Sequence, residues 1–243
     1  MIAFVGSLDY FDPNKDYGIV DNITWVELGR HNRLYDSVAQ HADMLSCSVG
    51  DKLVVAPYNY NRLVKDESFV RDHPMLTKRI VCGETELNES YPDNIAYNVA
   101  FIGEYAIHNT NYTDPVLKKL IDAQGYKWIH TKQGYSNCMM LPVASDALIT
   151  SDVGLAKTLR QNGFEVLIIE QGHIKLPGLS YGFIGGASFT IGNTVYFNGN
   201  VDKHPNGQEI KTFISKKALQ IVNLSENQLF DFGSVRFLFE EDR

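Results

Sequence analysis

The chain has 243 residues, of which 44% are hydrophobic and 21% charged, and its formal net charge is -7. This composition supports a buried core and excludes a disordered chain. The acidic balance, with no run of Lys and Arg longer than two, argues against nucleic acid as a partner. No apolar run approaches the length of about 18 residues that spans a membrane, and the N-terminus lacks the basic start of a signal peptide. We therefore expect a cytoplasmic protein without a membrane segment.

The cysteines point to no framework of disulfides or structural zinc. Cys47, Cys82 and Cys138 are few and scattered, and the chain contains no CxxC pair. Cys47 and Cys82 lie within apolar segments and are predicted to be core residues.

The N-terminal part predicts two strands separated by a long polar loop. Residues 1–6 and 23–28 are apolar and read as strands, and residues 33–40 form a short helix or turn. The loop between the strands, residues 9–22, is long enough to act as a lid or as a dimer contact.

The rest of the chain repeats one pattern. Four pairs of short apolar runs, each joined by a small turn, predict β-hairpins over residues 44–56, 97–108, 139–150 and 188–197. Their turn positions Gly50, Gly103, Ser145 and Gly192 are 53, 42 and 47 residues apart. After each hairpin comes a predicted helix and then an apolar strand. The helices cover residues 68–78, 114–124, 152–162 and 207–218, and Asp114 and Asp152 are suited to cap two of them.

A fifth unit is split between the two ends of the chain. Residues 234–239 resemble the first strand of a hairpin, and residues 1–6 are placed to supply the second, because residues 4–9 (FVGSLD) echo residues 197–202 (FNGNVD) at the end of the fourth hairpin. Pairing the two ends would close five strand–strand–helix–strand units into a ring, which removes exposed sheet edges. The predicted fold is therefore α/β, a single domain over residues 1–243 built as a closed ring of five units.

This arrangement resembles the α/β-propeller of the pentein superfamily. Four stretches carry the resemblance, and they are similar to a bacterial branch of that superfamily: residues 132–138 (KQGYSNC), 172–178 (GHIKLPG), 181–186 (YGFIGG) and 229–234 (LFDFGS). The superfamily holds guanidino-group-modifying enzymes, namely deiminases, dimethylarginine dimethylaminohydrolases and amidinotransferases, and also a ribosome-binding factor without catalytic activity. The resemblance thus implies a five-bladed propeller and a small cationic ligand.

The chain departs from those enzymes at the nucleophile. The enzymes carry a cysteine in the last repeat, preceded by a histidine, whereas here Phe237 falls at or near the cysteine position and Arg236 at the histidine position. A phenylalanine cannot attack a guanidinium carbon, so the standard covalent reaction is not carried over.

A shared register selects the candidate site. Counting seven residues back from the four turn positions gives Asp43, Ala96, Cys138 and Gly185, and Asp231 stands at the comparable place before the fifth inner strand. In a ring, such positions converge on a central channel. Asp43 and Asp231 could bind a cationic group, although aspartates that cap turns are common at such places.

Other residues could complete the site. Cys138 is the cysteine in a polar context, and Lys132 could lower its pKa, but a buried structural cysteine is the alternative. His173 is a candidate acid/base or a loop residue bonded to a backbone carbonyl, and His41 is similar. Tyr181 opens a glycine-rich stretch that lets backbones approach in the channel, without the Lys-Ser/Thr of a nucleotide-binding loop. The spacing of His41, Asp43 and His173 matches no recognised metal motif, so we expect neither metal nor cofactor.

Two functions compete. One is a protein that binds a small cationic ligand, guanidino or amino-acid-like, in the channel without covalent chemistry. The other is a divergent guanidino-group-modifying hydrolase or amidinotransferase that uses Cys138 as nucleophile and His173 as acid/base. A thiol pKa well below 8 at Cys138 would favour the enzyme, and an inert thiol would favour binding. The sequence does not specify the oligomeric state.

Overall fold

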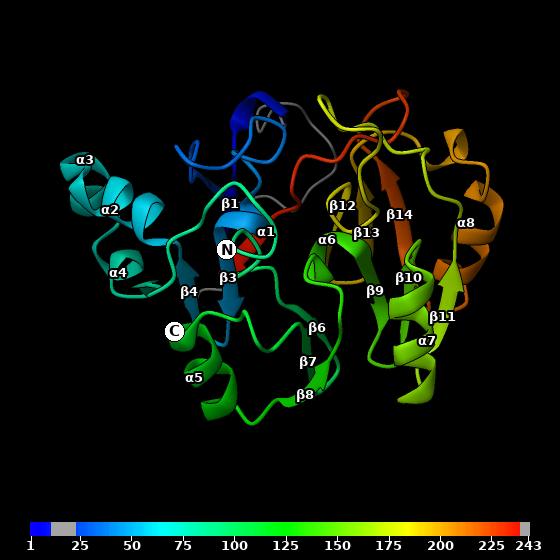
Figure 1. The fold of residues 1–243 in the computed structure, drawn as a ribbon. Helices are drawn as coiled ribbons and strands as arrows, with labels where there is room; N and C mark the ends of the chain where they lie inside the picture. Colours follow the sequence, from blue (N-terminus) through cyan, green and yellow to red (C-terminus); the bar gives the residue numbers. More distant parts are fainter. Residues whose placement is uncertain (11–22, 239–243) are drawn as a thin grey trace.

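Five three-stranded sheets, each with the same strand pattern, make up the fold (Figure 1). The computed structural model describes residues 1–10 and 23–238. In every sheet the middle strand pairs antiparallel with the strand before it and parallel with the strand after it. The predicted lid or dimer contact over residues 9–22 lies largely outside the described residues.

Four of the sheets are continuous in sequence. They are β3 (Ser46–Val49), β4 (Lys52–Val55) and β5 (Ile80–Cys82); β6 (Ala100–Ile102), β7 (Tyr105–His108) and β8 (Lys127–His130); β9 (Met140–Ala144), β10 (Ala147–Thr150) and β11 (Glu165–Ile168); and β12 (Ser188–Ile191), β13 (Thr194–Phe197) and β14 (Gln220–Asn223). The hairpin turns follow the prediction. Gly50, Gly103 and Gly192 have φ between 54° and 58°, the left-handed region that glycine enters without strain. The third turn has no such glycine, and its hairpin changes register between Ala147 and Leu148.

The fifth sheet joins the two ends of the chain. It contains β15 (Arg236–Leu238), β1 (Ile2–Val5) and β2 (Thr24–Glu27), and Ile2 pairs with Leu238. The prediction that residues 1–6 and 234–239 are neighbouring strands is confirmed by this pairing. β15 also lies against β3 of the first continuous sheet, and β6 lies against β9.

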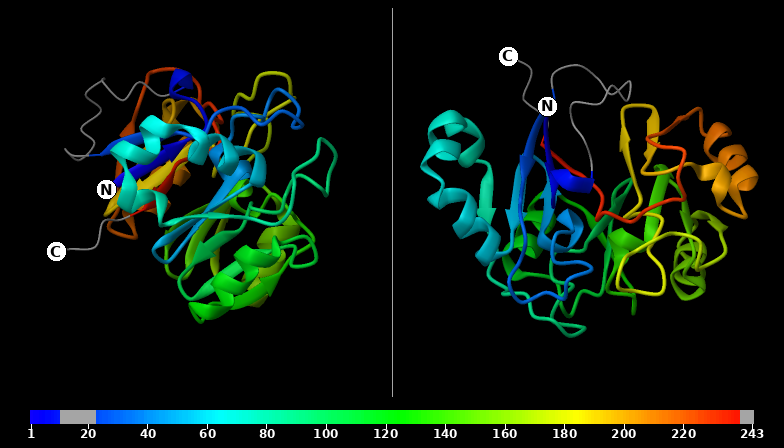
Figure 2. Two further views of the ribbon diagram at one scale, coloured as in Figure 1. Left: turned by 90° about the vertical axis from the view of Figure 1, so that its left-hand side faces the viewer. Right: turned by 90° about the horizontal axis from the view of Figure 1, so that it is seen from above.

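Helices lie outside the sheets, at the periphery of the molecule (Figures 1 and 2). They are α2 (Pro57–Lys65), α3 (Glu67–Asp72), α4 (Pro74–Thr77), α5 (Pro115–Ala123), α7 (Val153–Gln161) and α8 (Gly207–Ser215). The Asp114 and Asp152 side chains accept hydrogen bonds from the Leu117 and Leu155 amides, as expected for N-caps. Short 3-10 turns, η1 (Leu8–Tyr10) and η2 (Val201–Lys203), complete the described elements.

The structure corrects several local predictions. Residues 57–65, which lie between the first predicted hairpin and the helix predicted over residues 68–78, form the additional helix α2, because Pro57 starts a helix that packs Asn59 and Leu63 inward. Of the two alternatives predicted for residues 33–40, a short helix or a turn, the structure shows bends and turns. Cys47 is buried as predicted, but the core prediction is wrong for Cys82, which is partly exposed on β5.

Two short helices precede inner strands and position the candidate site. α1 (Ala42–Leu45) leads into β3, and α6 (Ser136–Met139) leads into β9. The sequence predicted strands there, because the apolar runs begin at Met44 and Met139. Among the described residues, no helix has both the length and the apolar character that crossing a membrane would require.

Candidate functional site

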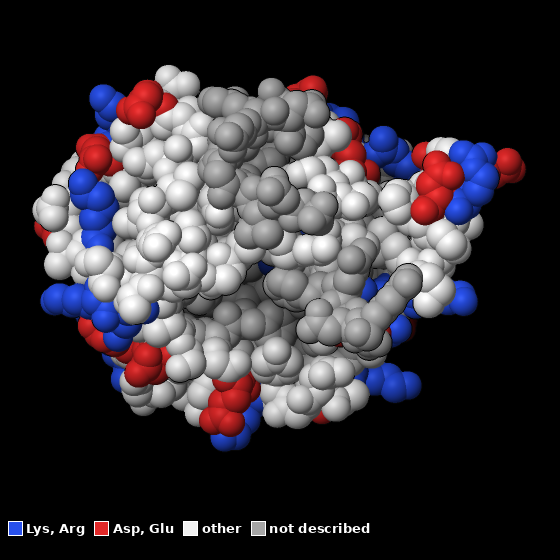
Figure 3. Space-filling view, turned by 180° about the vertical axis from the view of Figure 1, so that it is seen from behind, with Lys and Arg blue, Asp and Glu red and all other residues white. Residues whose placement is uncertain are grey.

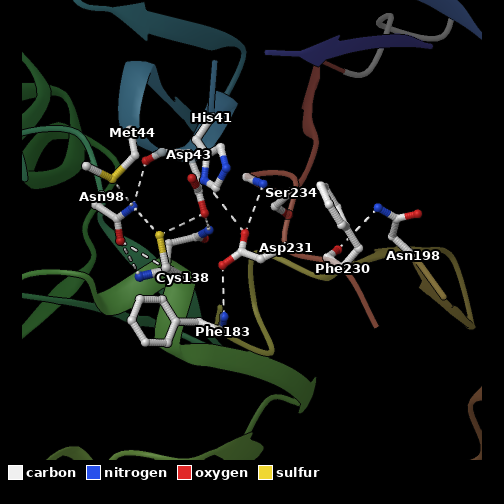
Figure 4. Close-up of polar contacts among 12 residues, drawn as sticks. His41, Asp43, Met44, Asn98, Cys138, Phe183, Asn198, Phe230, Asp231 and Ser234 are labelled. Atoms are coloured by element: carbon white, nitrogen blue, oxygen red, sulfur yellow. Dashed lines mark hydrogen bonds and ion pairs between the residues drawn. The ribbon is translucent and has the colours of Figure 1, made fainter. Parts of the chain in front are cut away.

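Asp43 and Cys138, which share a register in the sequence, form a direct contact. Asp43 lies in α1 and Cys138 in α6, and the Cys138 thiol donates to Asp43 Oδ2 over 3.0 Å (Figure 4). Both side chains are buried. The Asp43 amide donates to the Gly233 carbonyl, which ties the first inner strand to the segment before the last one.

Asn98, a residue that the sequence analysis missed, holds this pair in place. Its side-chain NH₂ group lies 3.0 Å from Cys138 Sγ and donates to the Asp43 carbonyl over 2.8 Å. Its Oδ1 accepts from the backbone amides of Asn137 and Cys138. The sequence does contain an indication of this role, since Asn98 is the one residue with a side-chain amide in the apolar run from residue 95 to 102. A buried side-chain amide needs hydrogen-bond partners.

Arg236 forms the other side of the cluster. Its Nη1 donates to Asn137 Oδ1 over 2.9 Å, and Asn137 Nδ2 donates to Asp43 Oδ2 over 3.4 Å. Asn137 therefore links the guanidinium to the carboxylate. Arg236 also donates to the carbonyls of Ser46 and Asp43. The sequence placed Arg236 at the position of the enzymes' histidine without giving it a role.

Asp231 is the second buried carboxylate of the site. The Phe183 amide donates to its Oδ2 over 2.8 Å and the Gly233 amide to its Oδ1 over 3.1 Å. His41 Nδ1 lies 3.7 Å from Oδ1. A Cβ at Gly182 or Gly186 would collide with the Asp231 side chain, so these glycines leave the space that the carboxylate occupies.

Burial dominates the electrostatics of the site. Loss of solvent raises the pKa of Asp43 and raises that of Asp231 to about 7, and it lowers the pKa of His41. The pKa of the Cys138 thiol is raised well above its ordinary value, first by burial and then by the negative charges of Asp43 and Asp231. Cys138 is thus a neutral thiol that donates a hydrogen bond, not a thiolate.

A cavity borders the site at His41 and Asp231, and we call it the His41 cavity. It has a volume of about 380 Å³ and is lined by Arg30, Asp36, Ser37, Gln40, His41, Leu176, Pro177, Gly178, Phe230 and Asp231. The Arg30 guanidinium pairs with Asp36 at its rim. Asp231 and His41 thus connect the buried cluster to this cavity.

Three residues singled out from the sequence lie elsewhere. His173 contacts Glu170 and His204, and in the part of the chain that the structure describes no hydrogen bond joins it to Cys138, Asp43 or Asp231. Lys132 is exposed. Tyr181 reaches the site only through its ring contact with Phe183. The pairing of Cys138 with His173, and the lowering of its pKa by Lys132, are therefore not seen in this structure.

A metal site is not formed by these residues. His41 and Asp43 share the cluster but His173 does not, and residues 1–10 and 23–238 contain no group of three side chains suited to hold a metal ion.

Comparison with known proteins places the chain in a family. A family model described as a family of unknown function, DUF6873, matches residues 20–236. The chain belongs to this family. Comparison with curated proteins finds no match.

Solved structures establish the fold. An agmatine deiminase from C. jejuni has a TM-score of 0.53 and 12% sequence identity, with 93% of this chain and 79% of that chain covered. The citrulline complex of a dimethylarginine dimethylaminohydrolase from Pseudomonas aeruginosa has a TM-score of 0.51 and 11% identity, covering 84% and 74%. An amidinotransferase of saxitoxin biosynthesis from Microseira wollei has a TM-score of 0.51 and 10% identity, covering 84% and 71%. The DUF6873 chain therefore has the pentein fold.

Proposed function

We propose that this chain is a single five-bladed α/β-propeller domain that binds a small cationic ligand, guanidino or amino-acid-like, without the standard covalent chemistry. The observation that carries the proposal is a pair of buried carboxylates with which, in the part of the chain that the structure describes, no lysine or arginine side chain forms a salt bridge. Asp43 Oδ1 has no hydrogen-bond partner among the described residues, and Asp231 faces the His41 cavity.

A cationic ligand would supply what the site lacks. A buried carboxylate is costly unless a donor or a positive charge compensates it, and guanidinium and ammonium groups provide both. His41 does not, because burial lowers its pKa and keeps the ring neutral at neutral pH. The names of the similar structures, which concern agmatine and dimethylarginine, support a ligand of this class.

The protonation of Asp231 predicts how binding depends on pH. With a pKa of about 7, Asp231 is mostly protonated at pH 6 and mostly ionised at pH 8. A cation binds the ionised form, so affinity should rise about tenfold between these values, and binding below pH 7 should release a proton.

The alternative, a hydrolase or amidinotransferase with Cys138 as nucleophile, is less well supported. Among the described residues no histidine bonds to the thiol, whose hydrogen-bond partners are Asn98 and Asp43, and the negative charge of Asp43 disfavours a thiolate. Its raised pKa leaves little thiolate at neutral pH.

Calorimetric titration with arginine and citrulline tests the proposal. The two molecules have nearly the same shape, but the ureido group of citrulline carries no charge. We expect arginine, agmatine or dimethylarginine to bind, citrulline to bind at least tenfold more weakly than arginine, and Asp231→Asn to remove the difference. Asp93→Asn, at an exposed turn, is the matched control and should change nothing.

Two results would contradict the proposal. Equal affinities for arginine and citrulline would show that charge is not recognised. Release of ammonia or transfer of an amidino group, abolished by Cys138→Ser, would show that the protein is an enzyme and that the alternative is correct.

A further inference from the structure

A second cavity borders the buried cluster at Asn137 and Arg236, and we call it the turn-end cavity. Its volume is about 470 Å³. It lies among four inner strands, β6, β9, β12 and β15, and the turn residues Gly103, Ser145 and Gly192 line its rim. The face seen from behind is hollowed near its centre, and the charged side chains of the described residues lie mostly around its periphery (Figure 3).

We propose that the turn-end cavity binds a small organic anion with an apolar body, whose negative group is held by the Arg236 guanidinium. This inference is independent of the function proposed for the His41 cavity. The structure assigns it from the lining, the burial and the unused donors of Arg236.

Arg236 is the one charged residue in the described lining of this cavity. The lining comprises Phe101, Ile102, Gly103, Asn137, the segment 140–145, Gly185, Ser188, Phe189, Thr190, Gly192, Leu219 and the segment 234–237, with no aspartate or glutamate. An anion in the turn-end cavity would therefore meet a positive group and no negative one. The His41 cavity is different, because Asp231 and Asp36 line it.

The guanidinium is buried and incompletely satisfied. Arg236 is 8% exposed, and its three hydrogen bonds go to Ser46, Asn137 and Asp43. A guanidinium has five N–H groups, so one N–H on each Nη atom remains beyond these bonds. No carboxylate among the described residues lies within 4.0 Å of it, and hydrogen bonds link it to the Asp43 carboxylate through the Asn137 side chain. A buried charge of this kind is stabilised by an anion.

The remaining walls favour an organic body over a bare inorganic ion. Side chains of Phe101, Met140, Val143 and Phe189 line the turn-end cavity. Two of its hydroxyl groups are engaged elsewhere, since Ser188 donates to the Ile184 carbonyl and Ser234 to the Ser188 carbonyl. The cavity thus offers one strong anion-binding group at one end and apolar surface for the rest of the ligand, the usual composition of a small-molecule site.

Titration with 3-phenylpropionate and its neutral amide, 3-phenylpropanamide, tests the proposal. We expect the carboxylate to bind at least tenfold more tightly than the amide. Inorganic phosphate is the third probe and should bind more weakly than 3-phenylpropionate. Equal binding of acid and amide, or phosphate binding as tight as that of the acid, would overturn the proposal.

Two variants locate the site. Arg236→Gln should abolish the preference for the acid. Because Arg236 also bonds to Ser46 and Asp43, this variant can lose stability, and Thr190→Phe provides a second test. Thr190 is a half-buried residue of β12 that lines the cavity and does not bond to Arg236. Its replacement by phenylalanine fills the cavity and should weaken 3-phenylpropionate binding at least tenfold, and unchanged affinity would refute the site.

Asp231→Asn separates this proposal from the function proposed above. It should leave 3-phenylpropionate binding unchanged while it reduces arginine binding in the His41 cavity. If this variant lost both 3-phenylpropionate binding and arginine binding, the two cavities would not be independent, and the assignment would be contradicted.

Discussion

The raised pKa of Asp231 predicts a pH dependence of stability that one substitution should remove. Burial raises this pKa from 3.8 to about 7. Below pH 3.8 both the folded and the unfolded chain hold the proton, and between 3.8 and about 7 only the folded chain holds it. The contribution of Asp231 to stability is therefore largest at low pH and is lost as pH rises through about 7. At about 1.4 kcal/mol per pH unit, the shift of about three units corresponds to roughly 4 kcal/mol.

Urea unfolding of the wild type and of Asp231→Asn between pH 4.5 and 8.5 measures this effect. The stability of the wild type relative to the variant should fall by about 1.4 kcal/mol per pH unit up to pH 7 and then level off. Burial lowers the pKa of histidines such as His31 and His108 to about 4, and their effect on stability has the opposite dependence on pH. Because this effect is present in both proteins, it cancels in the difference.

The amide at position 231 accepts one hydrogen bond fewer than the carboxylate, which gives an offset that does not depend on pH. The slope is therefore the diagnostic quantity. Asp93→Asn should show the wild-type slope. Parallel curves for the wild type and Asp231→Asn would refute the raised pKa, and with it the argument that Asp231 is held in a site without a cation.

The remaining predictions concern reactivity and packing. Burial and two nearby carboxylates raise the pKa of the Cys138 thiol, so Cys138 should react with iodoacetamide at pH 7.5 more slowly than the partly exposed Cys82. Mass spectrometry of the labelled native protein measures the two rates, and faster labelling of Cys138 would contradict its burial. Gly186→Ala should destabilise the protein by about 1–3 kcal/mol in urea, because the added methyl group meets the Asp231 carboxylate, and an unchanged midpoint would show that the carboxylate can move. The Asp114 carboxylate accepts hydrogen bonds from the amides of Glu84, Thr85 and Leu117, so Asp114→Ala should lower the free energy of unfolding by at least about 3 kcal/mol. A decrease below about 1 kcal/mol would show that water replaces the carboxylate.

The repeated turn spacing predicted most of the fold. Each hairpin and each capped helix is a local pattern, and Asp114 and Asp152 cap helices where their spacing indicated. The pairing of β1 with β15 was predicted from a weak echo between residues 4–9 and 197–202. α2 was missed, because Tyr58 and Tyr60 have no strong preference for a helix and the packing of Leu63 decides the outcome.

The site was predicted only where equivalent positions converge. Asp43 and Cys138 meet because they precede the inner strands at the same register. His173 failed as a member of the site, because its loop follows a different path and its ring meets His204. In the sequence, Asn98 and Arg236 stand out only as polar residues within apolar segments. Their hydrogen-bond partners come from other parts of the chain and are known only from the three-dimensional structure.

The pairing of β1 with β15 also bears on how the chain acquires its structure during synthesis. Each of the four continuous sheets is built from neighbouring segments, so its three strands can associate soon after they leave the ribosome. β1 is made before these four sheets, whereas its antiparallel partner β15 follows all of them in the chain. Closing so long a loop is slow, and until then β1 exposes a row of unpaired backbone groups. β1 is therefore the strand that most needs protection from other nascent chains until β15 has been made.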